Sequence, residues 1–260
     1  MRFALVFAIS LCLTSCASKS QRQNLLLKGN NAQVYAYYDV SGQFEYAREV
    51  KFSKGKLATR VQIMAEASGN ERLLEKTFAV SAVGSVKSQE GRVTAVRPEL
   101  SQHTVWLDGK KYFSQLKMNP KKRVLEAIMD GPDTKWQGKR EIKIPSGRIF
   151  CFYSQLPECL LLSDLLLSAD NGRRRLSFIM VWDSWPYHQE HFNGLKPSPF
   201  ASASLIAEAK KKSDKRYNVE VAGQTLSLHF SPDNTFVRMF WTSQGISLLP
   251  PGEKQDSEEI

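Results

Sequence analysis

The stretch His103–Met118, with the sequence HTVWLDGKKYFSQLKM, predicts a β-hairpin. Apolar and polar residues alternate on both sides of Asp108-Gly109, as they do in strands that bury one face. Asp-Gly is the pair that a two-residue type I′ turn favours, because both central positions of that turn need a positive φ angle. We therefore expect two antiparallel strands that are joined at Asp108-Gly109.

The same alternation continues outward from this hairpin. Nearer the N-terminus, three further strands with glycine-containing turns between them are expected at Val34–Val40, Phe44–Phe52 and Leu57–Ala65. Nearer the C-terminus, short strand patterns recur up to residue 249. Short strands at this spacing are typical of an antiparallel meander. The sequence thus predicts one mainly antiparallel sheet.

Two segments depart from the strand pattern and are expected to be helices. Pro157–Ala169 contains six leucines, more than one face of a surface helix needs. It is either an ordinary core helix or a helix that packs over the mouth of a curved sheet. Ala201–Lys212 is rich in alanine and ends in lysines, which suit the C-terminus of a helix.

Together these patterns predict a mainly β fold of the α+β class. We expect a strongly curved antiparallel sheet, or half-barrel, with one or two helices on its concave side. Residues 32–250 would form this single domain. Before it lie a leader at 1–15 and a lipidated, polar tether at 16–31, and after it residues 251–260 would form an acidic, disordered tail.

The N-terminus has the features of a secretory signal. Arg2 is followed by an apolar run, Phe3–Leu13, that is too short to span a bilayer as a helix. The run closes on Leu13-Thr14-Ser15-Cys16, which resembles the lipobox of bacterial lipoproteins at all four positions. The resemblance implies cleavage before Cys16 and a lipid on that cysteine, whose acyl chains anchor the protein in a membrane. A signal peptide that is cut elsewhere and an uncleaved anchor are the alternatives.

The resemblance also implies a location. In Gram-negative lipoproteins an Asp after the lipidated cysteine favours the inner membrane, and here Ala17 occupies that position. The implied location is the outer membrane, with the protein lipid-anchored and facing the periplasm. The formal net charge is +10. Such a balance is common in nucleic-acid-binding proteins, but export argues against nucleic acid and favours an anionic envelope polymer, or a charge that only serves solubility.

Cysteine usage predicts one disulfide. Cys12 leaves with the leader and Cys16 takes the lipid, so Cys151 and Cys159 remain in a compartment that permits disulfides. We predict that these two residues are bridged. Free thiols and a pair of metal ligands are the alternatives, although no further Cys or His lies close by to complete a metal site.

Aromatic residues gather between residues 182 and 192. Trp and Tyr suit a site that is apolar inside and wet outside, so this group could form the rim of a ligand site next to the leucine-rich helix. The other interpretation, which the composition alone favours, is a hydrophobic plug that closes one end of the sheet. The ligand-binding residues that we predict are Leu162, Leu165, Trp182, Trp185, Tyr187 and Phe192.

No motif in the sequence indicates catalysis. His188 and His191, with Glu190 between them, do not match the H-E-x-x-H pattern of zinc proteases. A nucleophile elbow, a P-loop and a dinucleotide fingerprint are also missing from the sequence. The sequence therefore favours a protein without catalytic activity, metal or cofactor.

By strand order and type of anchor, residues 32–250 are similar, at the level of fold, to the half-barrel periplasmic lipoprotein carriers and the outer-membrane lipoprotein receptor. The resemblance implies a membrane-anchored binding module for an apolar, acyl-chain-like ligand or an envelope partner. It implies no functional residue, because it depends on no motif beyond the lipobox. An enzyme acting on envelope polymers, and a structural lipoprotein in contact with anionic polymer, are the alternatives.

Overall fold

The computed structural model describes residues 31–67, 70–88, 91–147, 149–172, 175–187, 197–208 and 215–253. Several sequence predictions lie outside these ranges: the leader, Cys16, most of the tether and of the acidic tail, Phe192 and the His188/His191 pair. Within the described ranges the predicted class of fold is confirmed, because a single curved sheet makes up most of the structure.

Fifteen strands are described in this sheet. The first eight are β1 (Asn31–Asp39), β2 (Gly42–Ser53), β3 (Lys56–Ala67), β4 (Asn70–Ser88), β5 (Gly91–Leu107), β6 (Lys110–Asn119), β7 (Val124–Asp130) and β8 (Gly138–Lys143). The others are β9 (Phe150–Phe152), β10 (Leu176–Val181), β11 (Phe200–Ala207), β12 (Lys215–Val221), β13 (Gln224–Phe230), β14 (Phe236–Trp241) and β15 (Ile246–Leu249). The short 3-10 helices η1 (Thr134–Trp136), η2 (Tyr153–Gln155) and η3 (Thr242–Gln244) lie between them.

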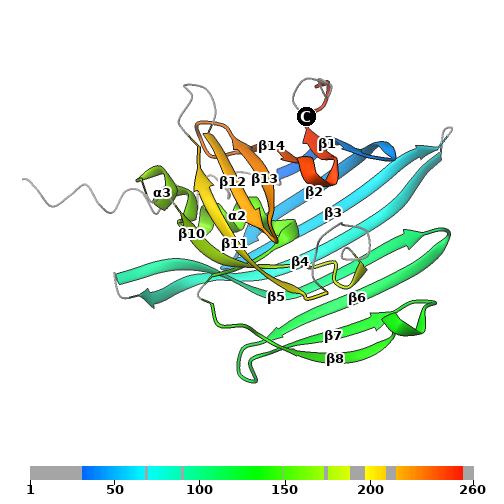
Figure 1. Cartoon of the computed structure of the whole chain (residues 1–260), viewed down its shortest axis with the longest axis horizontal. Coiled ribbons are helices and arrows are strands. Elements are labelled where there is room, and N and C mark those ends of the chain that lie inside the picture. Colours follow the sequence, from blue (N-terminus) through cyan, green and yellow to red (C-terminus); the bar gives the residue numbers. More distant parts are fainter. Residues whose placement is uncertain are drawn as a thin grey trace, which may run out of the picture.

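The sheet is built as two meanders that meet at its centre. Its strand order is β8-β7-β6-β5-β4-β3-β2-β1-β15-β14-β13-β12-β11-β10-β9. The chain runs outward from β1 to β8, crosses to the opposite edge at β9, and returns until β15 pairs with β1, with Tyr37 opposite Leu248. All described strand pairs are antiparallel except β9 with β10. Figure 1 shows β10–β14 in front of β2–β4, so the sheet folds over itself.

The predicted hairpin forms as expected. β5 and β6 pair with Leu107 opposite Lys110, and the two turn residues, Asp108 and Gly109, have φ angles of 49° and 74°. Both angles are positive, which is the geometry that favours Asp-Gly at a two-residue turn. This part of the fold is therefore set by local sequence.

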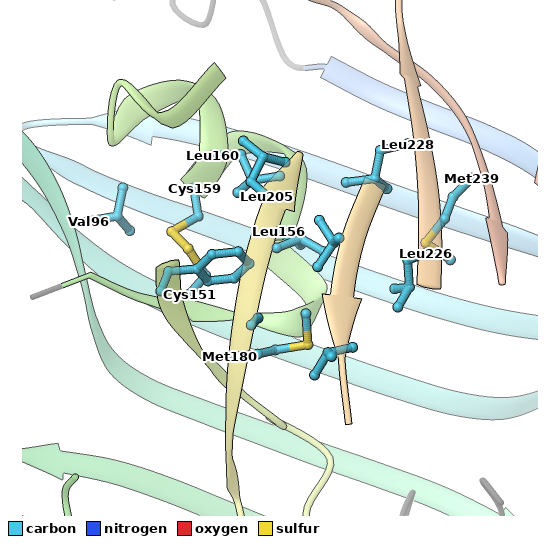
Figure 2. Packing of buried hydrophobic residues seen from close by; sticks show 14 of the residues in the cluster. Val96, Cys151, Leu156, Cys159, Leu160, Met180, Leu205, Leu226, Leu228 and Met239 are labelled. Atoms are coloured by element: carbon cyan, nitrogen blue, oxygen red, sulfur yellow. A yellow bond between two sulfur atoms is a disulfide. The ribbon is translucent and has the colours of Figure 1, made fainter. Parts of the chain in front are cut away.

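Two helices, α2 (Leu156–Leu162) and α3 (Leu165–Asp170), follow η2. One continuous helix was predicted over these residues, but Asp164 has a φ of 58° and separates the two. α2 packs against β5 and β9 inside the curve of the sheet, and all of its residues except Leu161 are buried. In Figure 2 its residues Leu156 and Leu160 lie close to Leu205 of β11 and Leu228 of β13. The leucine-rich segment is therefore surrounded by sheet.

The predicted disulfide is confirmed. Cys151 of β9 and Cys159 of α2 are bonded, with their Cα atoms 5.7 Å apart. Figure 2 shows the bridge beside Val96 of β5. The bridge therefore ties the edge strand β9 to the helix that fills the interior.

The prediction of a second helix at Ala201–Lys212 is wrong over residues 201–207, and residues 209–212 lie outside the described ranges. Strand β11 occupies Phe200–Ala207 and pairs with β10 on one side and β12 on the other. Ala203 and Leu205 are buried while Ser204 between them is not, which is the period of a strand. Pairing on both sides outweighs the weak helix propensity of the alanines.

Candidate ligand-binding cavity

A cavity lies inside the curved sheet, next to η2 and the start of α2. It encloses about 740 Å³ of space, part of which is continuous with solvent. Its apolar lining consists of Val61, Ile63, Leu156, Pro157, Leu228, Phe236, Met239, Ile246 and Leu248. Its polar lining consists of Tyr37, Tyr46, Arg48, Glu75, Thr77, Tyr153, Ser154 and Asp183. The cavity therefore has an apolar and a polar part.

The meeting of the two meanders explains the apolar part. Met239 of β14 lies opposite Leu248 of β15, and Leu248 lies opposite Tyr37 of β1. These positions belong to the inward face of each strand, because side chains alternate across a sheet. Residues from the two ends of the domain thus share one wall.

A buried ion pair closes one side of the cavity. Arg48 of β2 donates two hydrogen bonds to Glu158 of α2, at 2.9 and 2.7 Å, and a third to Gln33 Oε1 at 3.1 Å. The two charged side chains are only 2% and 8% exposed. Burial lowers the pKa of Arg48, but the charge and hydrogen bonds of Glu158 raise it more, so the pKa lies above its ordinary value. Arg48 therefore stays charged and holds α2 against β2.

A buried glutamine fixes the neighbouring segment. Gln155 of η2 donates from Nε2 to the carbonyl oxygens of Leu57 (3.2 Å) and Ala79 (3.0 Å), and its Oε1 accepts from Ser81 at 2.6 Å. The backbone N–H of Ser154 donates to Asp183 Oδ2 at 3.1 Å. The Gln155 side chain is therefore bonded to the sheet, and the backbone of Ser154 to the segment after β10, which keeps this wall in place.

The polar part also borders a cluster of polar side chains from β4 and β5. His103 Nδ1 lies 2.9 Å from Thr77 Oγ1 and 3.7 Å from Glu75 Oε1. The ring of His103 is fully buried and stacks on Tyr187 at a centroid distance of 6.1 Å. Thr77 and Glu75 line the cavity, whereas His103 lies behind them. The cluster therefore presents a hydroxyl and a carboxyl group to the cavity.

Three tyrosines complete the polar part and remain uncharged. Burial raises the pKa of Tyr37, Tyr46 and Tyr153, and the nearby Glu75 raises each of them further. Tyr37 and Tyr46 lie side by side, with ring centroids 6.4 Å apart. At physiological pH all three phenols are therefore neutral groups that can donate and accept hydrogen bonds.

The structure places the predicted ligand residues in the core instead. Leu162 and Leu165 are buried in the cluster around α2 and α3. Trp182, Trp185 and Tyr187 are also buried, so the predicted aromatic rim does not form from these three residues. None of these five residues is part of the cavity lining.

The aromatic segment instead packs as a hydrophobic plug, the interpretation that its composition favours. Trp182 stacks on Trp241, with centroids 5.9 Å apart and planes 7° apart, and contacts Tyr153 at 5.3 Å. Tyr187 meets Trp136 edge to face and donates from its hydroxyl to the carbonyl oxygen of Phe113 at 2.8 Å. Trp182 thus supports a cavity residue, Tyr153, from behind.

Sequence reasoning missed the polar residues of the cavity, although one of them carries a signal. In β2 the inward positions are Tyr46, Arg48 and Val50, so a charged residue stands among apolar neighbours. A charge at such a position has to be paired, because an unpaired buried charge is very costly. Arg48 therefore indicates an interior partner, which the structure identifies as Glu158.

Comparison with known families, curated proteins and solved structures finds no match to this chain. Within the described ranges, no group of three His, Cys, Asp or Glu side chains is arranged to hold a metal ion. Among the described helices, none is long and apolar enough to cross a membrane. The cavity and the sequence of the leader are therefore the features that bear on function.

Proposed function

We propose that this protein is an envelope lipoprotein, anchored through Cys16, that binds an apolar, acyl-chain-like ligand inside its curved sheet and does not transform it. The anchor follows from the lipobox-like sequence. The binding site follows from the cavity, and the observation that carries the proposal is its apolar wall at the junction of β1, β14 and β15.

The apolar wall suits a hydrocarbon chain. Leu228, Met239 and Leu248 come from three strands and face the same space. Each methylene that leaves water for such a wall contributes about 0.8 kcal/mol. Methionine adapts its shape readily, which favours a flexible chain over a rigid ring.

The polar part favours a ligand whose head group is uncharged. Arg48 is already engaged by Glu158 and Gln33, so it has little to offer an anion. The neighbouring Glu75 and Asp183 present carboxyl oxygens, and the tyrosines present neutral hydroxyls. This set fits a hydroxyl or ester head group better than a free carboxylate.

Displacement of an apolar fluorescent probe from the full chain tests the proposal. We expect 1-monoolein to displace the probe at lower concentration than oleate does. Ile63→Trp places a larger side chain at a half-buried position of the cavity wall, and it should weaken probe binding at least about tenfold. Ile128→Trp, at an exposed position of β7, is the matched control.

Urea unfolding of both variants shows whether each is folded. A folded Ile63→Trp variant that binds the probe as tightly as Ile128→Trp would refute binding in this cavity. If oleate displaces the probe at lower concentration than monoolein does, the proposal of an uncharged head group is refuted.

A further inference from the structure

A second hollow lies outside the cavity and differs from it in charge. This groove runs between β4–β6, the β6–β7 turn and the connection from β8 to β9, and it encloses about 1,910 Å³, part of it open solvent. It shares no lining residue with the interior cavity. The groove is therefore a separate site.

Three cations line this groove. Arg97 of β5, Lys117 of β6 and Arg123 of the β6–β7 turn are all exposed. Within the described part of the chain, none of the three pairs with a carboxylate. The one acidic residue of the lining, Glu99, is already bonded to Lys56. The groove thus carries a net positive charge that its own side chains do not neutralise.

Apolar side chains lie beside these cations. Leu100 stands opposite Lys117 in the β5–β6 pair, and Met118 follows Lys117 along β6. Ile144 and Phe150 close the groove from the β8–β9 connection. The backbone N–H of Ile144 donates to the carbonyl oxygen of Arg123 at 3.0 Å, which holds the connection against the turn. The apolar and the cationic sides of the groove are therefore held together.

We propose that this groove binds an anionic phospholipid. The phosphate lies among Arg97, Lys117 and Arg123, since guanidinium and ammonium groups are the usual partners of phosphate. The adjoining hydrocarbon lies along Leu100, Ile144 and Phe150, which a free phosphate would leave exposed to water. Charge and apolar surface together select an amphiphile with a negative head group. The interior cavity, in contrast, suits an uncharged head group.

Titration calorimetry on the full chain tests this proposal with soluble short-chain lipids. The probes are dihexanoylphosphatidylglycerol, which is anionic, dihexanoylphosphatidylcholine, which is zwitterionic, and inorganic phosphate, all below micelle-forming concentrations. We expect the anionic lipid to bind at least about tenfold more tightly than either of the other two. The proposal is overturned if the zwitterionic lipid binds equally well, or if inorganic phosphate does.

Charge-matched variants locate the binding. The groove variant is Arg97→Gln/Lys117→Gln/Arg123→Gln. The control is Lys110→Gln/Lys111→Gln/Lys139→Gln, which removes three exposed charges at the far end of β6 and on β8. A basic residue near an anionic lipid contributes about fivefold in affinity, so the groove variant should lose on the order of a hundredfold for the anionic lipid, while the control stays within about threefold of the unsubstituted chain. Equal losses in both variants, or no loss in the groove variant, would overturn the proposal.

Discussion

The ion pair between Arg48 and Glu158 gives the sharpest stability prediction. Both side chains are more than nine-tenths buried and share two hydrogen bonds. Glu158→Leu leaves the guanidinium buried without a carboxylate partner, next to Gln33 and the ring of Phe236. Removal of one member of such a pair typically costs 3–5 kcal/mol, because the other charge stays buried and uncompensated. We expect that loss in the free energy of unfolding, a large share of the 5–15 kcal/mol available to a typical domain.

Removing both charges should cost far less than the two single changes together. In Arg48→Met/Glu158→Leu no charge is left in the interior, and similar apolar volume fills the space. We therefore expect the double variant to be more stable than either single variant, with a coupling energy of at least about 2 kcal/mol.

The assay is urea unfolding followed by tryptophan fluorescence, with linear extrapolation to water. The matched control is Arg60→Met/Glu49→Leu, which removes a pair between β2 and β3 with 56% and 44% exposure and a separation of 3.9 Å. Such exposed pairs contribute about 0–1 kcal/mol. Additive single changes at Arg48 and Glu158, or a loss no larger than that of the control, would refute the assignment of this pair as the link between helix and sheet.

Three further outcomes are expected. Cys16→Ala should abolish labelling of the protein by a radioactive fatty acid, and equal labelling of both forms would contradict the lipobox resemblance. Cys151→Ser/Cys159→Ser should lower the free energy of unfolding by about 2–3 kcal/mol in the loop-entropy model, and peptide mapping without reductant should recover the linked pair from the unsubstituted protein. Leu165→Ala should cost about 2–5 kcal/mol in urea unfolding, as a large-to-small change at a buried site, and a loss below 1 kcal/mol would contradict its place in the core.

The curved sheet could be predicted from the sequence because its signals are local. Alternation within each strand and the Asp108-Gly109 turn specify pairs of neighbouring strands without reference to the rest of the chain. The buried leucines of α2 likewise indicated an interior position. Alanine and serine carry weaker signals, so the sequence of β11 predicts a helix, although pairing with β10 and β12 makes it a strand.

The cavity could not be predicted because it joins residues that are far apart in the sequence. The hydroxyl of Tyr35 donates a hydrogen bond to the carbonyl oxygen of Phe236, which lies 201 positions further along the chain. Tyr37 meets Leu248 only because β15 returns to β1. Aromatic content alone pointed instead to Trp182 and Trp185, which are large enough to bury themselves as a plug. Local pattern reveals which face of a strand is inward, but not which inward positions are left unfilled.

Native mass spectrometry of the protein extracted from its own membranes in mild detergent tests the central claim most directly. We predict one neutral, acyl-chain-containing molecule bound to each chain in addition to the covalent anchor, and its loss from the folded Ile63→Trp variant but not from Ile128→Trp. A chain that carries no such molecule, or an Ile63→Trp variant that retains it in full, would contradict the account.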